Sequence, residues 1–317
     1  MLEMKQHLDK HPQEWGRFQS EFNQGINGIF RDLMFFEKEN LFKEDEEKVY
    51  KLKKLFIENF RDDFVKGDYL KWSLGKPRGY AGDYKIIDCI YLNDPKTEGI
   101  ERLYDNYFQM SSISVAVRNR KEDFKKMILE EVEKSTSNVV KIMDLASGPC
   151  RDVVELIAHP SIAERRFIFH CYENDPEAIE YATNLLNGDE RVSFFKHNAV
   201  RLALKKEIEQ SIEHNYDIIF STGLFDYLDY NVSVRLVSNL KRLLKPGGRL
   251  LISDVRDKFS NPSIYFMEWV ADWSLLYRDD DNFRNIFLNA GFSPEDLSFG
   301  YEQQGVMQYI IALNRKT

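Results

Sequence analysis

Apolar residues in the first part of the chain recur at intervals of three and four positions. One such stripe contains Phe18, Phe22, Ile26, Ile29 and Phe30, and a second contains Val49, Leu52, Leu55 and Phe56. This spacing places apolar side chains on one face of an α-helix. Residues 84–95 and 100–135 show the same periodicity. We therefore expect a helical region over residues 1–135.

The segment Gly75–Asp83 interrupts this pattern with three glycines and a proline, which predicts a loop. With its flanks it forms a stretch, residues 72–84, that is rich in tyrosine, arginine and aspartate. Such a loop could close over a ligand as a lid. It could equally be a compact loop that packs its own aromatic rings on the core. The sequence leaves both readings open.

From about residue 136 the pattern changes to short apolar runs separated by amphipathic helical stretches. The runs are VVKIMDLA, RFIFHCYE, RVSFFKHN, YDIIFSTG and GRLLISDV. Strands alternating with helices predict a parallel sheet with crossover helices. A helix around Asp281–Ala290 and an antiparallel pair of strands at Ser298–Gln303 and Met307–Asn314 complete the pattern. We expect an α/β fold over residues 136–317: a doubly wound, Rossmann-like, mostly parallel seven-stranded sheet behind the N-terminal helical region.

Composition narrows the class of protein. The 317 residues, 43% of them hydrophobic, suffice for a large domain and an accessory region. A net charge of −8 argues against general nucleic-acid binding, which needs a basic surface. The three cysteines are widely spaced, so neither a disulfide framework nor a metal site is expected. The N-terminus lacks a secretory core and no apolar run reaches membrane-spanning length, so the cytoplasm is the expected location.

Distinctive residues occur at the ends of the predicted strands. In an open parallel sheet, ligands bind beyond the carboxyl ends of the strands. The first strand ends in Asp144–Arg151 (DLASGPCR), whose small residues let the backbone approach a ligand closely. The segment lacks the GKS/T element of phosphate loops. Asp144 alone could be a helix cap, but the recurrence of such residues favours a binding site.

The next strand ends continue the series. Glu173 ends the second strand, where a carboxylate can accept the hydroxyls of a ribose. Read alone, it could be a surface carboxylate. Asn198 ends the third strand, and its amide can donate to and accept from a purine edge. The fourth strand ends in small residues followed by Asp226 and Tyr227. The segment Pro246–Gly248 is typical of a turn before the fifth strand, and we expect it to be structural.

The ordered set DLASG, YENDPEA, HNA, YDIIFSTGLFDYL and LLKPGGRLLISDV resembles the class I S-adenosylmethionine-dependent methyltransferases over residues 138–260. The resemblance implies S-adenosyl-L-methionine as cofactor. It implies that the first-strand and fourth-strand residues hold its methionine part, Glu173 its ribose, and the remainder its adenine. The implied ligands are Asp144, Ala146, Ser147, Gly148, Glu173, Asn174, Asp175, Asn198, Ala199, Ser221 and Gly223. That family more often has glycines where this chain has Ala146 and Cys150; the alanine costs little if its φ is negative.

A narrower resemblance rests on KPRGYAGDY ahead of DLASGPCRD, with MEWVADWSLLYRDDDNFRNIFLNAGF beyond. This layout is similar to the bacterial 3-hydroxy fatty acid (3-hydroxypalmitate) methyl ester biosynthesis proteins, which are associated with signalling between cells. It implies a small, amphipathic acceptor whose carboxylate is O-methylated. The spaced aromatics Phe266, Trp269, Trp273 and Tyr277 could line an apolar pocket, although a buried helix face is the favoured reading.

Candidate acceptor-binding residues are the arginines Arg118 and Arg120, before the first strand, and Arg78. Arginine can bind a carboxylate through two hydrogen bonds, although solvated helix charge is the simpler reading of any single one. A carboxylate acceptor is ionised at pH 7 and needs no base, whereas a hydroxyl or amine does. The candidate catalytic residues are Tyr80, Tyr84, Asp226 and Tyr227, with His197 and Asp83 as further bases.

Other functions remain open at this point. The chain could methylate a hydroxyl or amine of another metabolite, or bind the cofactor as a regulator without turnover. Base N-methylation is disfavoured by the acidic composition and by FSTGLFDYL, which stands where an NPPY-type motif would be. The front helices could form a lid or a homodimer interface.

Overall fold

The computed structural model describes residues 2–160, 166–261 and 263–315 and separates into two compact units. The first unit comprises Met1–Val117 and Lys258–Ser274, and the second comprises Arg118–Asp257 and Leu275–Thr317. The division therefore differs from the boundary at 135/136 that the sequence suggested. The reason is packing: the ring of Phe124 contacts Phe220 and Tyr309 of the sheet, so the later turns of its helix belong to the second unit.

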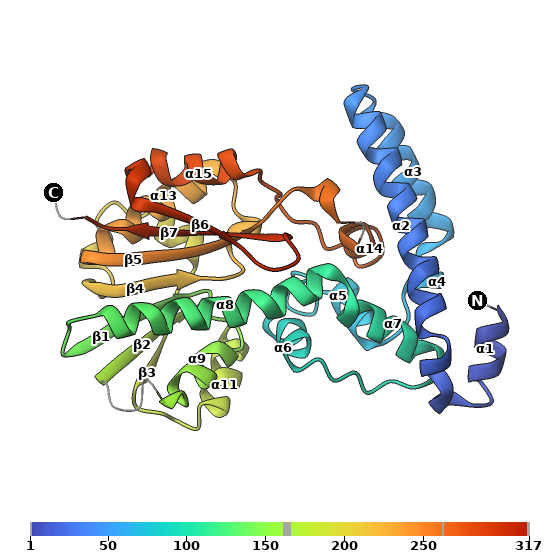
Figure 1. Cartoon of the computed structure of the whole chain (residues 1–317), viewed down its shortest axis with the longest axis horizontal. Coiled ribbons are helices and arrows are strands. Elements are labelled where there is room, and N and C mark those ends of the chain that lie inside the picture. Colours follow the sequence, from blue (N-terminus) through green and yellow to red (C-terminus); the bar gives the residue numbers. More distant parts are fainter. Residues whose placement is uncertain (1, 161–165, 262, 316–317) are drawn as a thin grey trace. The chain divides into compact units, whose positions relative to one another are not determined.

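The first unit is helical, as expected. Its elements are α1 (Leu2–Leu8), η1 (Pro12–Arg17), α2 (Gln19–Phe42), α3 (Glu46–Asn59), α4 (Arg61–Phe64), α5 (Asp68–Gly75), α6 (Tyr84–Leu92), α7 (Gly99–Met110), η4 (Lys258–Ser260) and α14 (Ser263–Val270). Helix α8 (Ser112–Lys134) begins here and continues into the second unit. Helices α2 and α3 pack side by side (Figure 1). The apolar stripe of α2 buries Phe22, Ile26 and Phe30.

Helix α14 returns to the first unit and completes its core. The ring of Phe266 lies edge-on to Phe30 at 5.3 Å and to Tyr107 at 4.8 Å between centroids. Trp269 packs against Phe56 at 5.6 Å. These rings therefore have the core role that the sequence favoured over a ligand pocket. The predicted helical spacing stops at Val270, so Trp273 and Tyr277 lie beyond the helix.

The second unit is an α/β sheet of seven strands among the described residues. The strands are β1 (Val139–Leu145), β2 (Arg166–Glu173), β3 (Val192–Lys196), β4 (Tyr216–Ser221), β5 (Leu244–Val255), β6 (Leu297–Tyr301) and β7 (Met307–Leu313). The helices are α9 (Arg151–Ile157), α11 (Pro176–Leu185), α12 (Ala199–Ala203), α13 (Tyr230–Leu243) and α15 (Asp280–Asn289), with short turns η2 (Ile208–Gln210), η3 (Phe225–Tyr227) and η5 (Pro294–Asp296). The predicted doubly wound, Rossmann-like fold is confirmed.

The strand order is β3-β2-β1-β4-β5-β7-β6, as Figure 1 shows. Strands β1 to β5 pair in parallel, and β7 is antiparallel to both β5 and β6. Every residue of β4 is buried, as expected for a parallel strand covered on both faces. The order reverses between β1 and β4, and such a switch marks the ligand-binding edge of an open α/β sheet.

The predicted turn at Pro246–Gly248 is an irregularity inside β5, where the pairing with β4 shifts register. Gly247 has φ +83°, and Asn314 bonds to both glycines through its backbone. The segment is therefore held by the sheet. Among the residues described, the structure contains no helix with the length and apolarity that crossing a membrane requires.

Candidate functional site

The loop after β1 has an unusual backbone. Ala146, Gly148 and Cys150 all have positive φ, at +57°, +54° and +53°. The condition under which alanine costs little, a negative φ, is not met at Ala146, because the loop keeps a left-handed conformation at all three positions. For a residue with a Cβ this conformation costs roughly 1–2 kcal/mol. Strain of this kind concentrates at functional sites.

Asp144 ends β1 with an unsatisfied carboxylate. It is 2% exposed, and its Oδ2 has no hydrogen-bond partner among the described residues. Burial, with the ionisable groups of Asp152, Cys150 and Glu173 nearby, raises the pKa of Asp144 well above its usual range. Asp144 is not a helix cap, because Cys150 occupies the N-cap of α9. Within the same described part of the chain, the hydroxyl of Ser147 is also buried without a partner.

Glu173 ends β2 and is buried, so the surface reading does not hold. Its Oε2 accepts the backbone N–H of Gly148 at 2.9 Å. Its Oε1 accepts those of Asn174 at 2.7 Å and Asp175 at 3.0 Å. The side chain of Asp175 caps α11 through Oδ1, while its buried Oδ2 has no partner within the described residues. Glu173 therefore ties the β1 loop to the end of β2.

The ends of β3 and β4 carry residues with structural bonds of their own. Asn198 caps α12 by accepting the backbone N–H of Arg201, and Ala199 opens that helix. The buried hydroxyl of Ser221 donates to the carbonyl of Leu145 at 2.8 Å, which links β4 to β1. Asn198 and Ser221 thus shape the strand ends, whatever else they bind.

Arg120 lies in α8 and is 3% exposed. Its Nη1 lies 3.6 Å from Asp226 Oδ2 and 3.9 Å from the sulfur of Met307. Its Nε has no hydrogen-bond partner within the described chain. A Cβ added at Gly223 would lie 3.3 Å from Arg120 Nη2, so the guanidinium lies against the end of β4. The structure thus brings Arg120, Gly223 and Asp226 together. The sequence had indicated each of them only as a separate candidate.

Asp226 is buried, and its Oδ1 accepts the backbone N–H of Val255 at 2.9 Å. Beside it lies Asp254, a residue that the sequence reasoning missed. Arg278 donates to both oxygens of Asp254, at 3.1 and 2.9 Å, and to the carbonyl of Phe225 at 2.9 Å. Burial and the neighbouring Asp226 raise the pKa of Asp254 well above its usual range, against the effect of Arg278. Asp254 lies at the end of β5, and this position in the sequence could have indicated it as a candidate site residue.

Three other candidates of the second unit are less deeply buried. Tyr227 belongs to η3 and is 39% exposed. Arg118 is half-buried, and burial lowers its pKa. His197 directly follows β3, and burial together with Lys205 lowers its pKa.

The candidates of the first unit lie in a shorter loop than predicted. Trp72 to Gly75 belong to α5, and Lys76 ends that helix in a left-handed conformation. The loop therefore contains Arg78 and Tyr80, while Tyr84 opens α6. Asp83 is fully buried and accepts N–H groups of Trp72, Lys85 and Ile86, which makes it a helix cap.

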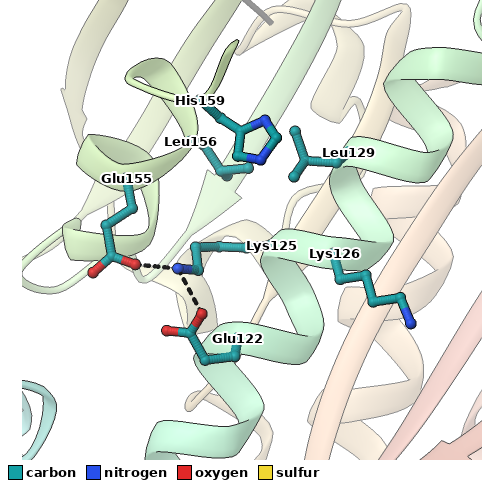
Figure 2. A pocket seen from close by; sticks show the side chains of 7 residues that line it. All are labelled: Glu122, Lys125, Lys126, Leu129, Glu155, Leu156 and His159. Atoms are coloured by element: carbon teal, nitrogen blue, oxygen red, sulfur yellow. Dashed lines mark hydrogen bonds and ion pairs between the residues drawn. The ribbon is translucent and has the colours of Figure 1, made fainter. Parts of the chain in front are cut away.

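A cavity of about 210 Å³ lies between α8 and α9 (Figure 2). Its lining residues are Glu122, Lys125, Lys126, Leu129, Glu155, Leu156 and His159. Lys125 pairs with both Glu122 and Glu155, so these charges neutralise one another. None of the predicted site residues lines this cavity, and the strand ends remain the candidate site.

Comparison with known proteins agrees with this geometry. Residues 143–250 match the model of a family described as a methyltransferase domain. No curated protein matches the chain significantly.

Among solved structures, a possible exported protein from Bordetella parapertussis has a TM-score of 0.58 and 17% identity, over 94% of this chain and 97% of that one. The CurJ carbon methyltransferase has a TM-score of 0.53 and 13% identity, over 84% and 71% of the two chains. The CMeT domain of the citrinin polyketide synthase has a TM-score of 0.52 and 15% identity, over 79% and 60%. These similarities concern the fold. Residues 143–250, which lie in the second unit, are thus similar to a methyltransferase domain.

Proposed function

We propose that this protein transfers the methyl group of S-adenosyl-L-methionine to the carboxylate of a small amphipathic acid, such as a 3-hydroxy fatty acid, and so forms a methyl ester. The similarity to a methyltransferase domain supports the reaction class. The unsatisfied polar atoms at the strand ends support the cofactor, and the buried guanidinium of Arg120 supports the acceptor class.

The residues at the strand ends fit the cofactor. Buried polar groups in proteins are normally hydrogen-bonded, so the unpartnered oxygens of Asp144, Ser147 and Asp175 require a ligand or water. A carboxylate at Asp144 suits the ammonium group of the methionine part. The backbone at Gly148 is left-handed, and no described residue beyond its chain neighbours lies within 4 Å of where a Cβ would be, so a ligand can approach the loop closely there. Bound there, the cofactor supplies a methyl group on a sulfonium centre.

Each strand end contributes one part of this proposed site. Glu173 keeps lone pairs for ribose hydroxyls, because its two oxygens accept only three backbone N–H groups. The amide of Asn198 and the adjoining backbone are assigned to the adenine edge. The full proposed set is Asp144, Ala146, Ser147, Gly148, Glu173, Asn174, Asp175, Asn198, Ala199, Ser221 and Gly223.

The acceptor class rests on Arg120. Its separation of 3.6 Å from Asp226 is longer than a hydrogen bond. Among residues 2–160, 166–261 and 263–315, this buried guanidinium therefore has none of the close oxygen acceptors that such a group needs. A carboxylate would satisfy it through charge-assisted hydrogen bonds. In this proposal Asp226 orients Arg120 rather than acting as a base. An ionised carboxylate accepts a methyl group without losing a proton, so catalysis consists of alignment and exclusion of water.

The remaining candidates take secondary places in the proposal. Arg118 is the second acceptor-binding arginine of α8. Tyr227 belongs to η3 and directly follows Asp226 in the sequence. Three further candidates belong to the first unit and stay predictions: Arg78 as an acceptor-binding residue, and Tyr80 and Tyr84 as catalytic residues.

The test measures S-adenosylhomocysteine formation with 3-hydroxy fatty acids and with alcohols and amines of matched chain length. We expect turnover of the acids alone. Arg120→Gln should raise KM for the acid at least tenfold, since a hydrogen bond to a charged group contributes about 1.5–3 kcal/mol. Arg235→Gln, at an exposed arginine of α13, is the matched control and should leave KM unchanged.

Three results would overturn parts of the proposal. Turnover of alcohols or amines but not acids would contradict the acceptor class. An Arg120→Gln variant that loses only cofactor affinity would assign Arg120 to the cofactor. Cofactor binding without product from any acceptor would indicate a regulatory protein instead of an enzyme.

A further inference from the structure

Two cysteines that are distant in the sequence lie together beside the strand ends. The pairing of β1 with β2 places Cys171 opposite Asp144. The loop after β1 then brings back Cys150 at the start of α9. One carboxylate oxygen of Asp144 and the two sulfur atoms all lie within 4.8 Å of one another. All three residues are buried.

This geometry is close to that of a metal site. In a tetrahedral zinc site the Zn–S distance is about 2.3 Å, which puts two bound sulfurs roughly 3.8 Å apart. Sulfurs already within 4.8 Å therefore need to move by no more than about 1 Å in total to reach that separation. Two thiolates and one carboxylate form a ligand set that favours a thiophilic cation over Mg²⁺ or Ca²⁺.

An independent observation points to a ligand at this cluster. Asp144 Oδ2 is buried without a hydrogen-bond partner among the described residues. The thiols, in contrast, face each other: a hydrogen bond with Cys150, together with burial, raises the pKa of Cys171 well above its usual range. The cluster thus has its three ligand atoms already within 4.8 Å of one another.

We propose that Asp144, Cys150 and Cys171 form a binding site for one thiophilic divalent cation such as Zn²⁺. Three protein ligands leave the fourth tetrahedral position open. The binding step forms two metal–thiolate bonds and releases the two thiol protons to solvent, together with that of the Asp144 carboxyl where it is protonated. The charged groups around the cluster are the carboxylates of Asp152 and Glu173, with Lys121 acting on Asp152. Their net negative charge favours a cation.

The site also has a consequence for regulation, which rests on the proposed function. Asp144 would serve both the cation and the methionine part of the cofactor. A bound cation therefore excludes the cofactor, and the two compete for one carboxylate.

The test titrates Co²⁺ into the metal-free full chain, kept reduced with a phosphine. We expect one equivalent to bind, with the visible bands of tetrahedral cobalt and thiolate-to-metal charge transfer, and Zn²⁺ to displace it. Cys171→Ala and Cys150→Gly should each weaken binding at least 100-fold. Glycine suits φ +53° at position 150, so that variant keeps the loop conformation. Cys89→Ala, at the third cysteine in α6 of the first unit, is the matched control and should bind as the wild type does.

Absence of the cobalt bands would overturn the site. So would cobalt affinities of the Cys150 and Cys171 variants that equal the affinity of the wild type. The thiols of a denatured sample prepared without reductant should also be titrated. A single thiol, where three are expected, would indicate a disulfide between Cys150 and Cys171 instead of a metal site. None of these measurements needs the cofactor. Calorimetry of S-adenosylhomocysteine with and without saturating Zn²⁺ then tests the competition: weaker binding with Zn²⁺ supports it, and equal binding overturns the competition but not the metal site.

Discussion

The carboxylate of Glu173 accepts the backbone N–H of Gly148 at 2.9 Å, and this bond joins the loop after β1 to the end of β2. The same carboxylate accepts the N–H groups of Asn174 and Asp175. One side chain therefore sets the shape of two neighbouring strand ends. It is also the proposed ribose ligand, so loop structure and cofactor binding depend on the same residue.

Glu173→Gln should lower the free energy of unfolding. The amide replaces one accepting oxygen by an NH₂ group, which leaves a buried backbone N–H unsatisfied at a cost of about 1–3 kcal/mol. Urea denaturation measures the change. Glu180→Gln, at an exposed glutamate of α11, is the control and should stay within about 0.5 kcal/mol of the wild type. Equal midpoints for the Glu173 variant and the wild type would contradict the anchoring role.

Ala146→Gly should stabilise the protein. Relief of the left-handed strain stabilises the folded state by roughly 1–2 kcal/mol. The greater loss of backbone entropy of glycine on folding offsets about 0.5–1 kcal/mol of this gain. The expected net gain is about 0.5–1 kcal/mol by thermal or chemical denaturation. Ala158→Gly tests the reasoning at an exposed position with φ −85°, where the same substitution should destabilise. A loss of stability at both positions would show that Ala146 is not strained.

Gly248→Ala should destabilise strongly. A Cβ there would lie 2.7 Å from the carbonyl oxygen of Tyr216 and 3.0 Å from that of Lys245, and backbone cannot move aside cheaply. We expect a loss of about 2–3 kcal/mol or more. Gly300→Ala in β6 places its Cβ 3.5 Å from the Tyr309 ring, an ordinary contact, and should cost clearly less. Comparable losses in the two variants would refute the close approach at Gly248.

Asp152 predicts a dependence of stability on pH. Burial raises its pKa to about 6, from 3.8 in the unfolded chain. A raised pKa contributes stability below pH 4 that is lost as the pH rises through 6, by at most about 3 kcal/mol. Asp152→Asn should therefore gain stability relative to the wild type between pH 5 and 7.

Denaturation curves at pH 2.5, 4, 5.5 and 7 measure this difference and that of the control. Asp189→Asn provides the opposite sign, because a hydrogen bond from Arg191 lowers the pKa of Asp189. Its wild-type contribution is present at neutral pH and is lost as the pH falls below 4. A constant difference between Asp152→Asn and the wild type over this range would contradict the buried, protonated carboxyl.

Most of the fold could be predicted because its signal is local. Short apolar runs such as YDIIFS give strands wherever both faces are buried. The antiparallel pair Leu297–Tyr301 and Met307–Leu313 closes one edge of the sheet, as the sequence indicated. The errors arose where a boundary depends on a single residue or on distant packing. Gly75 belongs to the last turn of α5 rather than to the loop, because Lys76 takes the left-handed position that ends the helix. The unit boundary depends on Phe124 packing against the sheet, which periodicity alone does not reveal.

The candidate site also contains residues that the sequence could predict and others that it could not. Asp144 and Glu173 could be predicted as members of one site because each ends a strand, and the carboxyl ends of parallel strands share one edge of the sheet. The backbone conformation of Ala146 and the approach of Cys150 to Cys171 depend on how the loop folds back over β1, and no local pattern encodes that. Arg278 donates a hydrogen bond to Asp254 from an irregular segment. No periodic pattern in the sequence predicts that contact.

The central claim is that the strand ends of the second unit bind S-adenosylmethionine through Glu173. Calorimetric titration of S-adenosylhomocysteine into the wild type and into folded Glu173→Ala tests it most directly. We predict one bound molecule per wild-type chain and an affinity at least tenfold weaker in the variant. No binding to the wild type, or equal affinity in the two proteins, would contradict the account.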